Sequence, residues 1–387
     1  MKTLLIEFQT SGHYPEYLKH VLNKINQTNT QDNFIIYLTP TLKPHLKNFE
    51  NTGIYKSITF FEKSLAEQYN NFSNTRQMAN MYYEQILSIK KKVSFDHILF
   101  LNLGLVSKCL KFLNPFLKQH FTFSGILMSS PYMQRQHTNV GLRFIKHEMH
   151  LRLLVRNKNC SKIFFLNDRK GVDFYKKWST KVDFINDPVR LNTSSDLNIY
   201  KYHSIKPKAI AFLQIGKLGA YKGTLDIIDA FSDLESDYSK QAHLLLIGKV
   251  NRDTNLENDK VKKLKNEKAL SIRDEFVSDS DFSAYMEQSH VVLIANKNIE
   301  NSSGIVNHCL ANNKVVIAPD KGFYKEAFKN YKAIVNYNAS FSLKDAMVYA
   351  LDNFEGLSDE AQKFDNKSFI EENSVEVFST TLLKDLI

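Results

Sequence analysis

A carboxylate and three small residues stand where an expected buried strand, 291–295, gives way to a helix. Glu300 is followed within four residues by Ser302, Ser303 and Gly304. The first N–H groups of a helix lack partners within the helix, and the helix dipole makes that end positive. We therefore predict an anion site beside Glu300, at the carboxyl end of a parallel strand, where open α/β sheets bind ligands.

A second loop with suitable chemistry lies at residues 215–224, IGKLGAYKGT. Gly216 follows an expected strand, and Lys217 and Lys222 flank the loop before a helix starts. Lysine cations and backbone N–H groups can together neutralise a diphosphate. The spacing is neither that of a P-loop nor that of the dinucleotide-binding Gly-x-Gly-x2-Gly motif. A surface turn with two solvated lysines is the alternative interpretation.

Metal chemistry is not expected. Asp279 and Asp281 have Asp-x-Asp spacing, but they stand before a helix, where aspartate is a favoured N-cap. His147 and His150 lack the i, i+4 spacing that puts two histidines on one helix face. The three cysteines lie far apart in the sequence, so we predict neither metal ligation nor disulfides, and a reducing compartment.

Expected strands alternate with helical segments, and this order must position both loops. In the first half we expect strands at 2–7, 34–38, 57–61, 97–101, 125–128, 162–166 and 182–185. The alternation then restarts, with strands at 209–215, 243–247, 272–277, 291–295, 315–318 and 333–335. This pattern predicts an α/β fold with two doubly wound, mostly parallel sheets.

A chain of 387 residues suits two domains of ordinary size. We predict an N-terminal Rossmann-like domain at 1–190 and a C-terminal one at 209–370. The stretch 191–208 has few apolar residues, so we assign it as a linker. Residues 371–387 are amphipathic and are expected to form a helix that packs back on the first domain.

The charge is unevenly distributed. The chain carries +10 overall, with +13 in residues 1–200 and −3 in the remainder. A basic first half suggests that this half meets an anionic surface or ligand, although compositional drift is an alternative.

The N-terminal apolar run is broken by Glu7, which favours a first strand over a signal peptide. No stretch approaches the roughly 18–20 apolar residues of a membrane span. We therefore expect a cytoplasmic protein.

The segment 141–158, GLRFIKHEMHLRLLVRNK, interleaves apolar and basic residues at helical spacing. Such a helix can lie in an anionic membrane interface, which makes peripheral binding to the inner face of the cell membrane a hypothesis. A core helix with a solvated basic face is the alternative.

The motifs of the second half occur in a fixed order. They are Gly216-Lys217-Leu218, Lys222-Gly223, Gly248, Val277–Tyr285, Glu300 and Lys314–Asp320 with Gly322. Over about 120 residues this order resembles the donor-binding half of GT-B fold glycosyltransferases, most closely glycosyltransferase family four (group 1).

The resemblance implies two Rossmann-like domains facing across a cleft. It also implies retaining, metal-independent transfer of a hexosyl group from a nucleotide-diphosphate sugar to an acceptor hydroxyl. The acceptor would be a glycan or a lipid-linked saccharide in cell-surface polysaccharide synthesis. No cofactor and no nucleic acid partner are expected.

The resemblance assigns catalytic roles to Glu300, Lys222 and Lys217. The donor-binding residues would be Gly216, Gly223, Gly248, Phe276, Val277, Ser278, Ser302, Ser303, Gly304 and His308. In the first domain, loops that follow strands supply acceptor-side candidates, and a surface-loop role is the alternative for each. These candidates are Gly12, His13, Tyr132 and His137.

The sequence departs from the family pattern at three places. Lys217 replaces an arginine, and lysine cannot bind phosphate as a rigid fork. His308 stands where the family has a second glutamate, although a neutral imidazole nitrogen can still accept a hydrogen bond. Ser302-Ser303-Gly304 replaces Gly-Phe-Gly.

Two other functions remain open. A sugar-nucleotide epimerase of the same fold would need carboxylates and histidines around the cleft, and no obvious set is present. A non-enzymatic basic protein that binds membrane or nucleic acid would tolerate changes at Glu300, Lys217 and Lys222.

Overall fold

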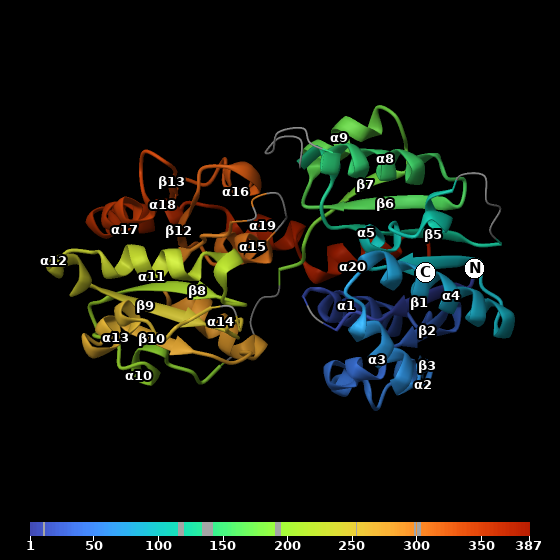
Figure 1. The fold of residues 1–387 in the computed structure, drawn as a ribbon, viewed down its shortest axis with the longest axis horizontal. Coiled ribbons are helices and arrows are strands. Elements are labelled where there is room, and N and C mark those ends of the chain that lie inside the picture. The colour runs from blue at the N-terminus through green and yellow to red at the C-terminus, as the bar shows by residue number, and fades with distance from the viewer. Residues whose placement is uncertain are drawn as a thin grey trace. The chain divides into compact units, whose positions relative to one another are not determined.

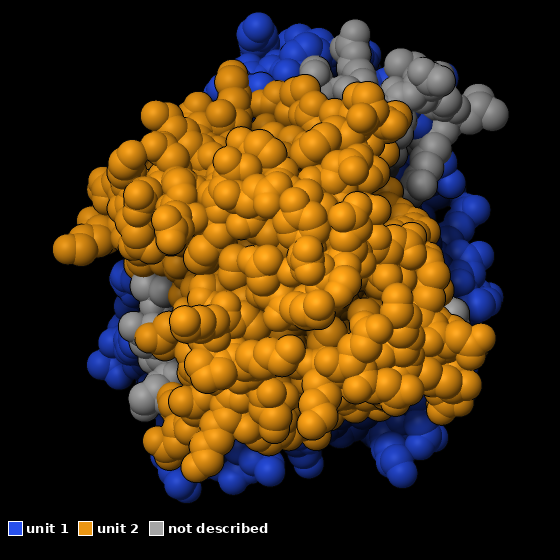
Figure 2. Space-filling model, turned by 90° about the vertical axis from the view of Figure 1, so that its left-hand side faces the viewer, with its two compact units in different colours: residues 1–187, 375–387 blue, residues 188–374 orange. Residues whose placement is uncertain are grey.

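The structure is a computed structural model. It describes residues 1–10, 12–114, 120–133, 142–189, 195–252, 254–297, 299 and 303–387. These residues form two compact units, which Figure 2 colours separately. Unit 1 comprises Met1–Asp187 and Val375–Ile387, and unit 2 comprises Pro188–Ser374.

Unit 1 is built on a parallel sheet with strand order β3-β2-β1-β4-β5-β6-β7 (Figure 1). The strands are β1 (Thr3–Glu7), β2 (Phe34–Leu38), β3 (Ile58–Phe60), β4 (His97–Phe100), β5 (Thr122–Leu127), β6 (Cys160–Leu166) and β7 (Val182–Ile185). The helices are α1 (Tyr14–Gln27), α2 (Gly53–Lys56), α3 (Lys63–Asn71), α4 (Thr75–Lys92), α5 (Leu103–Val106), α6 (Leu110–Leu113), α8 (Leu142–Arg156), α9 (Arg169–Lys176) and α20 (Val375–Leu383), with 3-10 turns η1 (Gln31–Asn33) and η2 (Pro40–Phe49).

Alternate residues of β1 supply two cores, one on each face of this sheet. Leu4 and Ile6 pack with residues of α4, α8 and α9, whereas Leu5 packs with residues of α1 and α20. This follows from the two-residue period of a strand, which sends successive side chains to opposite faces. Because both faces are covered, most side chains of the central strands are apolar and buried.

Unit 2 has a parallel sheet with strand order β10-β9-β8-β11-β12-β13. The strands are β8 (Ile210–Ile215), β9 (Ala242–Ile247), β10 (Leu270–Arg273), β11 (Val291–Leu293), β12 (Val315–Pro319) and β13 (Ile334–Tyr337). The helices are α10 (Ile199–Tyr202), α11 (Thr224–Ser232), α12 (Ser236–Ser239), α13 (Asp259–Asn266), α14 (Asp279–Gln288), α15 (Gly304–Ala311), α16 (Gly322–Ala327), α17 (Leu343–Asp352), α18 (Phe354–Gln362) and α19 (Asn366–Glu372), with the 3-10 turn η3 (Ala220–Lys222).

The order of the unit 2 strands reverses between β8 and β11, since the chain leaves β8 toward β9 and later returns to the other side of β8. This is the order of a dinucleotide-binding Rossmann sheet, in which the ligand lies at the carboxyl ends of the strands beside the reversal.

Part of the segment expected to be a linker, 191–208, is instead folded into unit 2. Residues 195–208 lie in unit 2 and include α10. The Gln288 side chain accepts from the N–H of Ile199 and donates to the carbonyl of Leu197, and Ile199 is fully buried. A single buried isoleucine among polar residues is too weak a pattern to have indicated this.

The chain ends within unit 1. Phe378, Leu382 and Leu383 of α20 join the core formed by Tyr17 and its neighbours on α1, and Lys24 pairs with Glu376. Of the segment 371–387, residues 371–372 end α19 in unit 2, and the helix α20 packs on unit 1. Among the described residues, no helix combines the length and apolar character needed to cross a lipid bilayer.

Candidate functional site

The described donor residues predicted from the sequence gather at one edge of unit 2. Gly216 follows β8, Gly248 follows β9, Val277 comes between β10 and α14, and Ser303 and Gly304 start α15 after β11. In a parallel sheet all of these positions lie at the carboxyl edge, and β8 and β11 flank the reversal of strand order. The structure thus brings together motifs separated by almost 90 residues of sequence.

Two glycines allow the loops at this edge to touch backbone to backbone. An added Cβ at Gly223, which has a φ of +67°, would lie 2.2 Å from the carbonyl oxygen of Ala295. Gly248 has a φ of +131°, and its Cβ would meet the carbonyl of Gly216. Since L-residues rarely adopt such φ values and no Cβ fits, these positions require glycine.

Lys222 lies on the loop between β8 and α11 and is half-buried. Burial lowers the pKa of its ammonium group, and no described carboxylate lies close enough to offset that effect. Its backbone carbonyl accepts from the Gln214 side chain at 3.0 Å, and its Nζ lies 5.7 Å from the centre of the Tyr221 ring. A buried cation without a carboxylate partner is costly in isolation, and an anionic ligand would offset the cost. Lys217, by contrast, is exposed.

The end of β11 contributes residues that the sequence did not single out. The N–H of Lys297 donates to the carbonyl of Tyr221 at 2.9 Å, and Lys297 Nζ lies 3.2 Å from an Asp226 carboxylate oxygen. Asn296 donates a hydrogen bond to the hydroxyl of Tyr324. These contacts tie the Lys222 loop and α16 to the segment that follows β11.

The remaining donor candidates divide by exposure. The Phe276 ring is 84% exposed just after β10, whereas Val277 is buried. Ser278 caps α14 by accepting from the N–H of Asp281 at 3.1 Å. His308 is half-buried on α15, with its ring 4.8 Å from that of Phe282.

The Asp-x-Asp sequence has a local role, although not the one expected. The N-cap of α14 is Ser278 rather than Asp279, because the serine hydroxyl already accepts the N–H of the first turn. Asp281 pairs with the guanidinium of Arg273 at 2.9 Å. Among the described residues, no cluster of three or more histidine, cysteine or acidic side chains could hold a metal ion.

Three predicted site residues, Glu300, Ser302 and His137, lie outside the described residues. Their roles remain predictions from the sequence.

The described acceptor-side candidates lie at the carboxyl edge of the unit 1 sheet, after β1 and β5. Gly12 is exposed with a φ of +72°, and the exposed His13 stacks on Tyr17 with ring centres 5.8 Å apart. Tyr132 is half-buried, with its ring 5.3 Å from that of Phe174 on α9. The Tyr132 ring therefore has a packing role, whereas the loop at 12–13 faces solvent.

Sequence reasoning missed a buried acid at the same edge. Glu7 ends β1 at 1% exposure, and its Oε1 accepts from the N–H groups of Phe8 and Gln9 and from the hydroxyl of Tyr82 at 2.6–2.8 Å. Burial raises the pKa of Glu7 to about 7. Glu7 thus fixes the start of the loop that leads to Gly12. In the sequence, the only sign of this role was the position of Glu7 in an expected buried strand.

The basic helix predicted at 141–158 is α8, which covers 142–156, and Trp178, just after α9, lies beside it. Leu151 and Leu154 enter the core of unit 1. Ile145, Met149 and Trp178 are instead 51–55% exposed, and the guanidinium of Arg152 lies 5.0 Å from the centre of the Trp178 ring. We call Ile145, Met149 and Trp178 the α8–α9 apolar patch.

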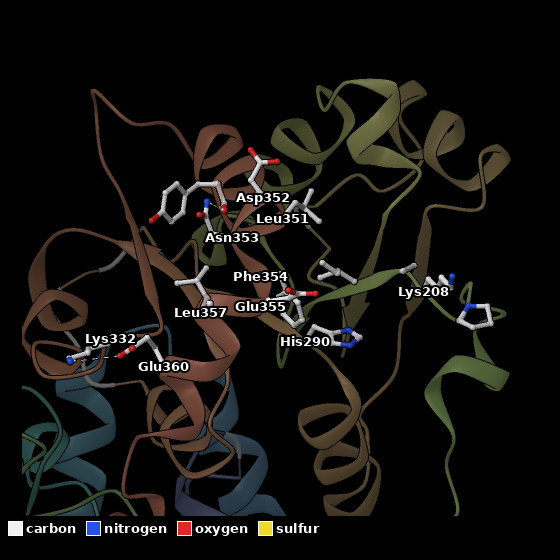
Figure 3. A pocket seen from close by; sticks show the side chains of 15 residues that line it. Lys208, His290, Lys332, Leu351, Asp352, Asn353, Phe354, Glu355, Leu357 and Glu360 are labelled. Atoms are coloured by element: carbon white, nitrogen blue, oxygen red, sulfur yellow. Dashed lines mark hydrogen bonds and ion pairs between the residues drawn. The ribbon is translucent and has the colours of Figure 1, made fainter.

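A cavity of about 1000 Å³ lies at the opposite, amino edge of the unit 2 sheet (Figure 3). Residues that precede β8, β11 and β13 line it, together with the junction of α17 and α18. Lys332 and Glu360 form an ion pair at 3.8 Å on one side, and Lys208 and His290 lie on the other. No described donor candidate lines this cavity, so we do not assign the donor to it.

A family model matches the second unit. Residues 198–378 match the family model described as glycosyl transferases group 1. This match covers unit 2 almost entirely and just under half of the chain. It extends over all the described donor candidates. No curated protein sequence matches the chain.

Solved structures share the fold over the whole chain. HepE from Anabaena, in complex with UDP, is 14% identical with a TM-score of 0.67, covering 100% of this chain and 99% of that one. WaaG, a glycosyltransferase involved in lipopolysaccharide biosynthesis, is 12% identical with a TM-score of 0.67, covering 98% and 99%. MnaA from S. aureus, with UDP, is 15% identical with a TM-score of 0.60, covering 100% and 98%. At identities this low, the structural likeness establishes the fold alone. It confirms the prediction of two Rossmann-like units of the GT-B type.

Proposed function

We propose that this protein is a glycosyltransferase that uses a nucleotide-diphosphate sugar as donor. The observation that carries the proposal is Lys222, a half-buried cation with no described carboxylate partner, at the strand-order reversal of a Rossmann sheet. The match of unit 2 to the group 1 glycosyltransferases supports the same conclusion.

In this mechanism the leaving group is the nucleoside diphosphate, whose negative charge increases as the glycosidic bond breaks. Lys222 and Lys217 stabilise that charge, and the N–H groups at the start of α15 add to it. Two lysines and a helix N-terminus supply positive charge that a divalent metal would otherwise supply, so we propose that transfer is metal-independent. Glu300 hydrogen-bonds the donor sugar and orients it.

We assign the base of the nucleotide to the segment Phe276–Ser278. The exposed ring of Phe276 offers a stacking surface at the edge of the site. We assign His308 on α15 to bind the ribose. We assign the acceptor hydroxyl to the carboxyl edge of the unit 1 sheet, where Gly12 and His13 lie, and propose retention of anomeric configuration.

We further propose that the acceptor is a saccharide presented at a membrane. The α8–α9 apolar patch includes two residues of α8, a helix that also carries the exposed Lys146, Arg152 and Arg156, and it lies on the basic half of the chain. Exposed apolar side chains flanked by cations are the arrangement that binds an anionic lipid interface.

Ligand-induced stabilisation tests the donor assignment. We expect one nucleoside diphosphate from a panel of uridine, guanosine, adenosine and thymidine diphosphates to raise the melting temperature, because a ligand bound only to the folded state stabilises it by mass action. The shift should persist in EDTA if no metal is needed. It should disappear in Lys222→Met, while the ligand-free variant melts no lower than wild type because the buried charge has gone.

Lys240→Met is the matched control. Lys240 is exposed in the same unit and pairs only weakly with Asp237, at 3.9 Å, so this variant should keep the full shift. A folded protein that responds to none of the diphosphates would refute the proposed function. A shift that survives in Lys222→Met would remove Lys222 from the site.

A further inference from the structure

Gln214 is a buried polar residue in a mostly apolar strand. It lies next to the end of β8 and is 5% exposed, and its neighbours Phe212 and Leu213 are fully buried. Its side-chain amide donates a hydrogen bond to the backbone carbonyl of Lys222 at 3.0 Å. Only the NH2 group of the amide can donate to a carbonyl, so this hydrogen bond fixes the orientation of the amide.

The oxygen of the same amide has no partner. Oε1 of Gln214 is shielded from solvent and makes no hydrogen bond within the part of the chain that the structure describes. A buried polar atom without a partner destabilises the folded state. An apolar side chain of similar length would fill this position of β8 without that cost. Departures of this kind from a local rule are expected at functional sites, so the amide calls for a role beyond packing.

This role follows from the two peptide groups that flank the Cα of Lys222. The carbonyl of Tyr221 belongs to the peptide group before it and accepts from the N–H of Lys297 at 2.9 Å. The carbonyl of Lys222 belongs to the peptide group after it and accepts from Gln214. Because peptide groups are planar, holding both carbonyls fixes the direction in which the Lys222 side chain leaves the backbone. A residue of β8 and one that follows β11 thus orient this side chain together.

The backbone around Lys222 is of a kind that needs such a restraint. Lys222 ends the 3-10 turn η3, where its N–H donates to the carbonyl of Gly219, and Gly223 follows with a φ of +67°. Short 3-10 turns have poorer hydrogen-bond geometry than α-helices, and glycine has the greatest conformational freedom of all residues. Without the Gln214 amide, the peptide group between Lys222 and Gly223 would lose its hydrogen bond to β8.

We propose that Gln214 is a positioning residue for the donor diphosphate and acts through Lys222. It holds the loop so that the Lys222 ammonium group is already directed at the phosphates of the leaving nucleotide. The loop then need not be ordered when the donor binds, and such preorganisation favours binding. The inference rests on the proposed function for its ligand, but the hold of Gln214 on the loop can be tested without one.

Gln214→Met replaces the amide with an unbranched apolar side chain of similar length. In calorimetry the nucleoside diphosphate should bind about three- to ten-fold more weakly, because the loop must now be ordered on binding and one neutral hydrogen bond typically has an effect of this size. Inorganic pyrophosphate should lose affinity by the same factor, since the effect lies at the phosphates. The melting temperature should stay close to that of wild type, because removal of the unpaired oxygen offsets the lost hydrogen bond.

Gln288→Met is the matched control. Gln288 is the last residue of α14, and its amide makes two hydrogen bonds to backbone, with the N–H of Ile199 and the carbonyl of Leu197. This variant should melt lower than wild type and keep its full affinity for the diphosphate. Loss of affinity without loss of stability in Gln214→Met would not follow from a merely structural role. Equal affinities in the two variants, or a loss that pyrophosphate does not share, would overturn the proposal.

Amide hydrogen exchange without ligand separates this inference from the proposed function. The N–H groups of Lys222 and Gly223 donate to carbonyls of the same loop at 2.9 and 3.1 Å. Gln214→Met should speed exchange at both amides, and Gln288→Met should leave their exchange unchanged. Faster exchange in a protein that binds no diphosphate would retain the hold of Gln214 on the loop and refute only the function. Unchanged exchange in Gln214→Met would refute that hold, whatever the ligand does.

Discussion

A Cβ added to Gly248 would lie 1.8 Å from the carbonyl oxygen of Gly216. Both glycines follow neighbouring strands, β9 and β8, at the carboxyl edge of the unit 2 sheet. We predict that Gly248→Ala lowers the melting temperature and abolishes the diphosphate-induced shift, because backbone must move to accommodate the methyl group. Gly356→Ala is the control, since its Cβ meets nothing within 4 Å on α18. This variant should gain about 0.5–1 kcal/mol of stability. Equal stability of the two variants would contradict the close approach.

Phe276→Ala should weaken nucleotide binding without affecting the fold. A ring that is 84% exposed contributes little to stability, whereas stacking on a base typically contributes about 1–3 kcal/mol. We therefore expect at least a several-fold loss of affinity for the nucleoside diphosphate, measured by calorimetry. Inorganic pyrophosphate, which has no base, should bind both proteins equally. Tyr349→Ala, which changes an exposed ring at the other edge of the same unit, should bind the nucleotide as wild type does.

Trp178 is the only tryptophan of the chain, so its fluorescence reports directly on the α8–α9 apolar patch. We predict that anionic vesicles shift its emission to shorter wavelength, that neutral vesicles do not, and that salt reverses the shift because it screens surface charge. Ile145→Ser/Met149→Ser should reduce the effect. Leu110→Ser, at an equally exposed leucine of α6, should not. An emission maximum that is the same with both vesicle types would remove the membrane proposal.

Stability should depend on pH through Glu7. Its folded pKa, about 7, lies above the ordinary value of 4.5, so the folded state holds its proton over a range where the unfolded state has lost it. The stabilisation of the folded state that Glu7 provides is complete below pH 4.5 and is lost as pH rises through about 7. The free energy lost is on the order of 3 kcal/mol.

Histidines 97, 203 and 243 act in the opposite direction, since burial lowers each pKa to about 4 and their contributions are lost as pH falls from 6.5. Glu7→Gln isolates the carboxylate. The melting temperature of wild type relative to this variant should fall from pH 5 to pH 8, and a constant difference would show that Glu7 does not titrate in that range.

The alternation of apolar strands and helical segments was enough to predict two doubly wound units. It failed where structure depends on single contacts. Helices α3 and α4 are separate because Asn74 caps a new helix by accepting from the N–H of Arg76. The expected linker instead holds α10 through Gln288.

In the candidate site, too, the sequence showed some residues and missed others. Lys222, Gly223 and Gly248 lie in short motifs, so the sequence showed them. Tyr324 and Glu7 were missed, because their side-chain partners, Asn296 and Tyr82, are brought near only by the folded chain. A tyrosine in a helix and a glutamate in a strand carry no local signal of such contacts.

The packing of α20 on α1 has a consequence for biosynthesis. During translation residues 1–187 precede unit 2 and residues 375–387 follow it, so the second core of unit 1 stays open while unit 2 is being made. A chain of residues 1–374 should be cleaved by protease first around α1. If α1 resists protease equally in residues 1–374 and residues 1–387, α20 does not protect this core. A nascent chain would therefore complete unit 2 before unit 1, although most of unit 1 is synthesised first.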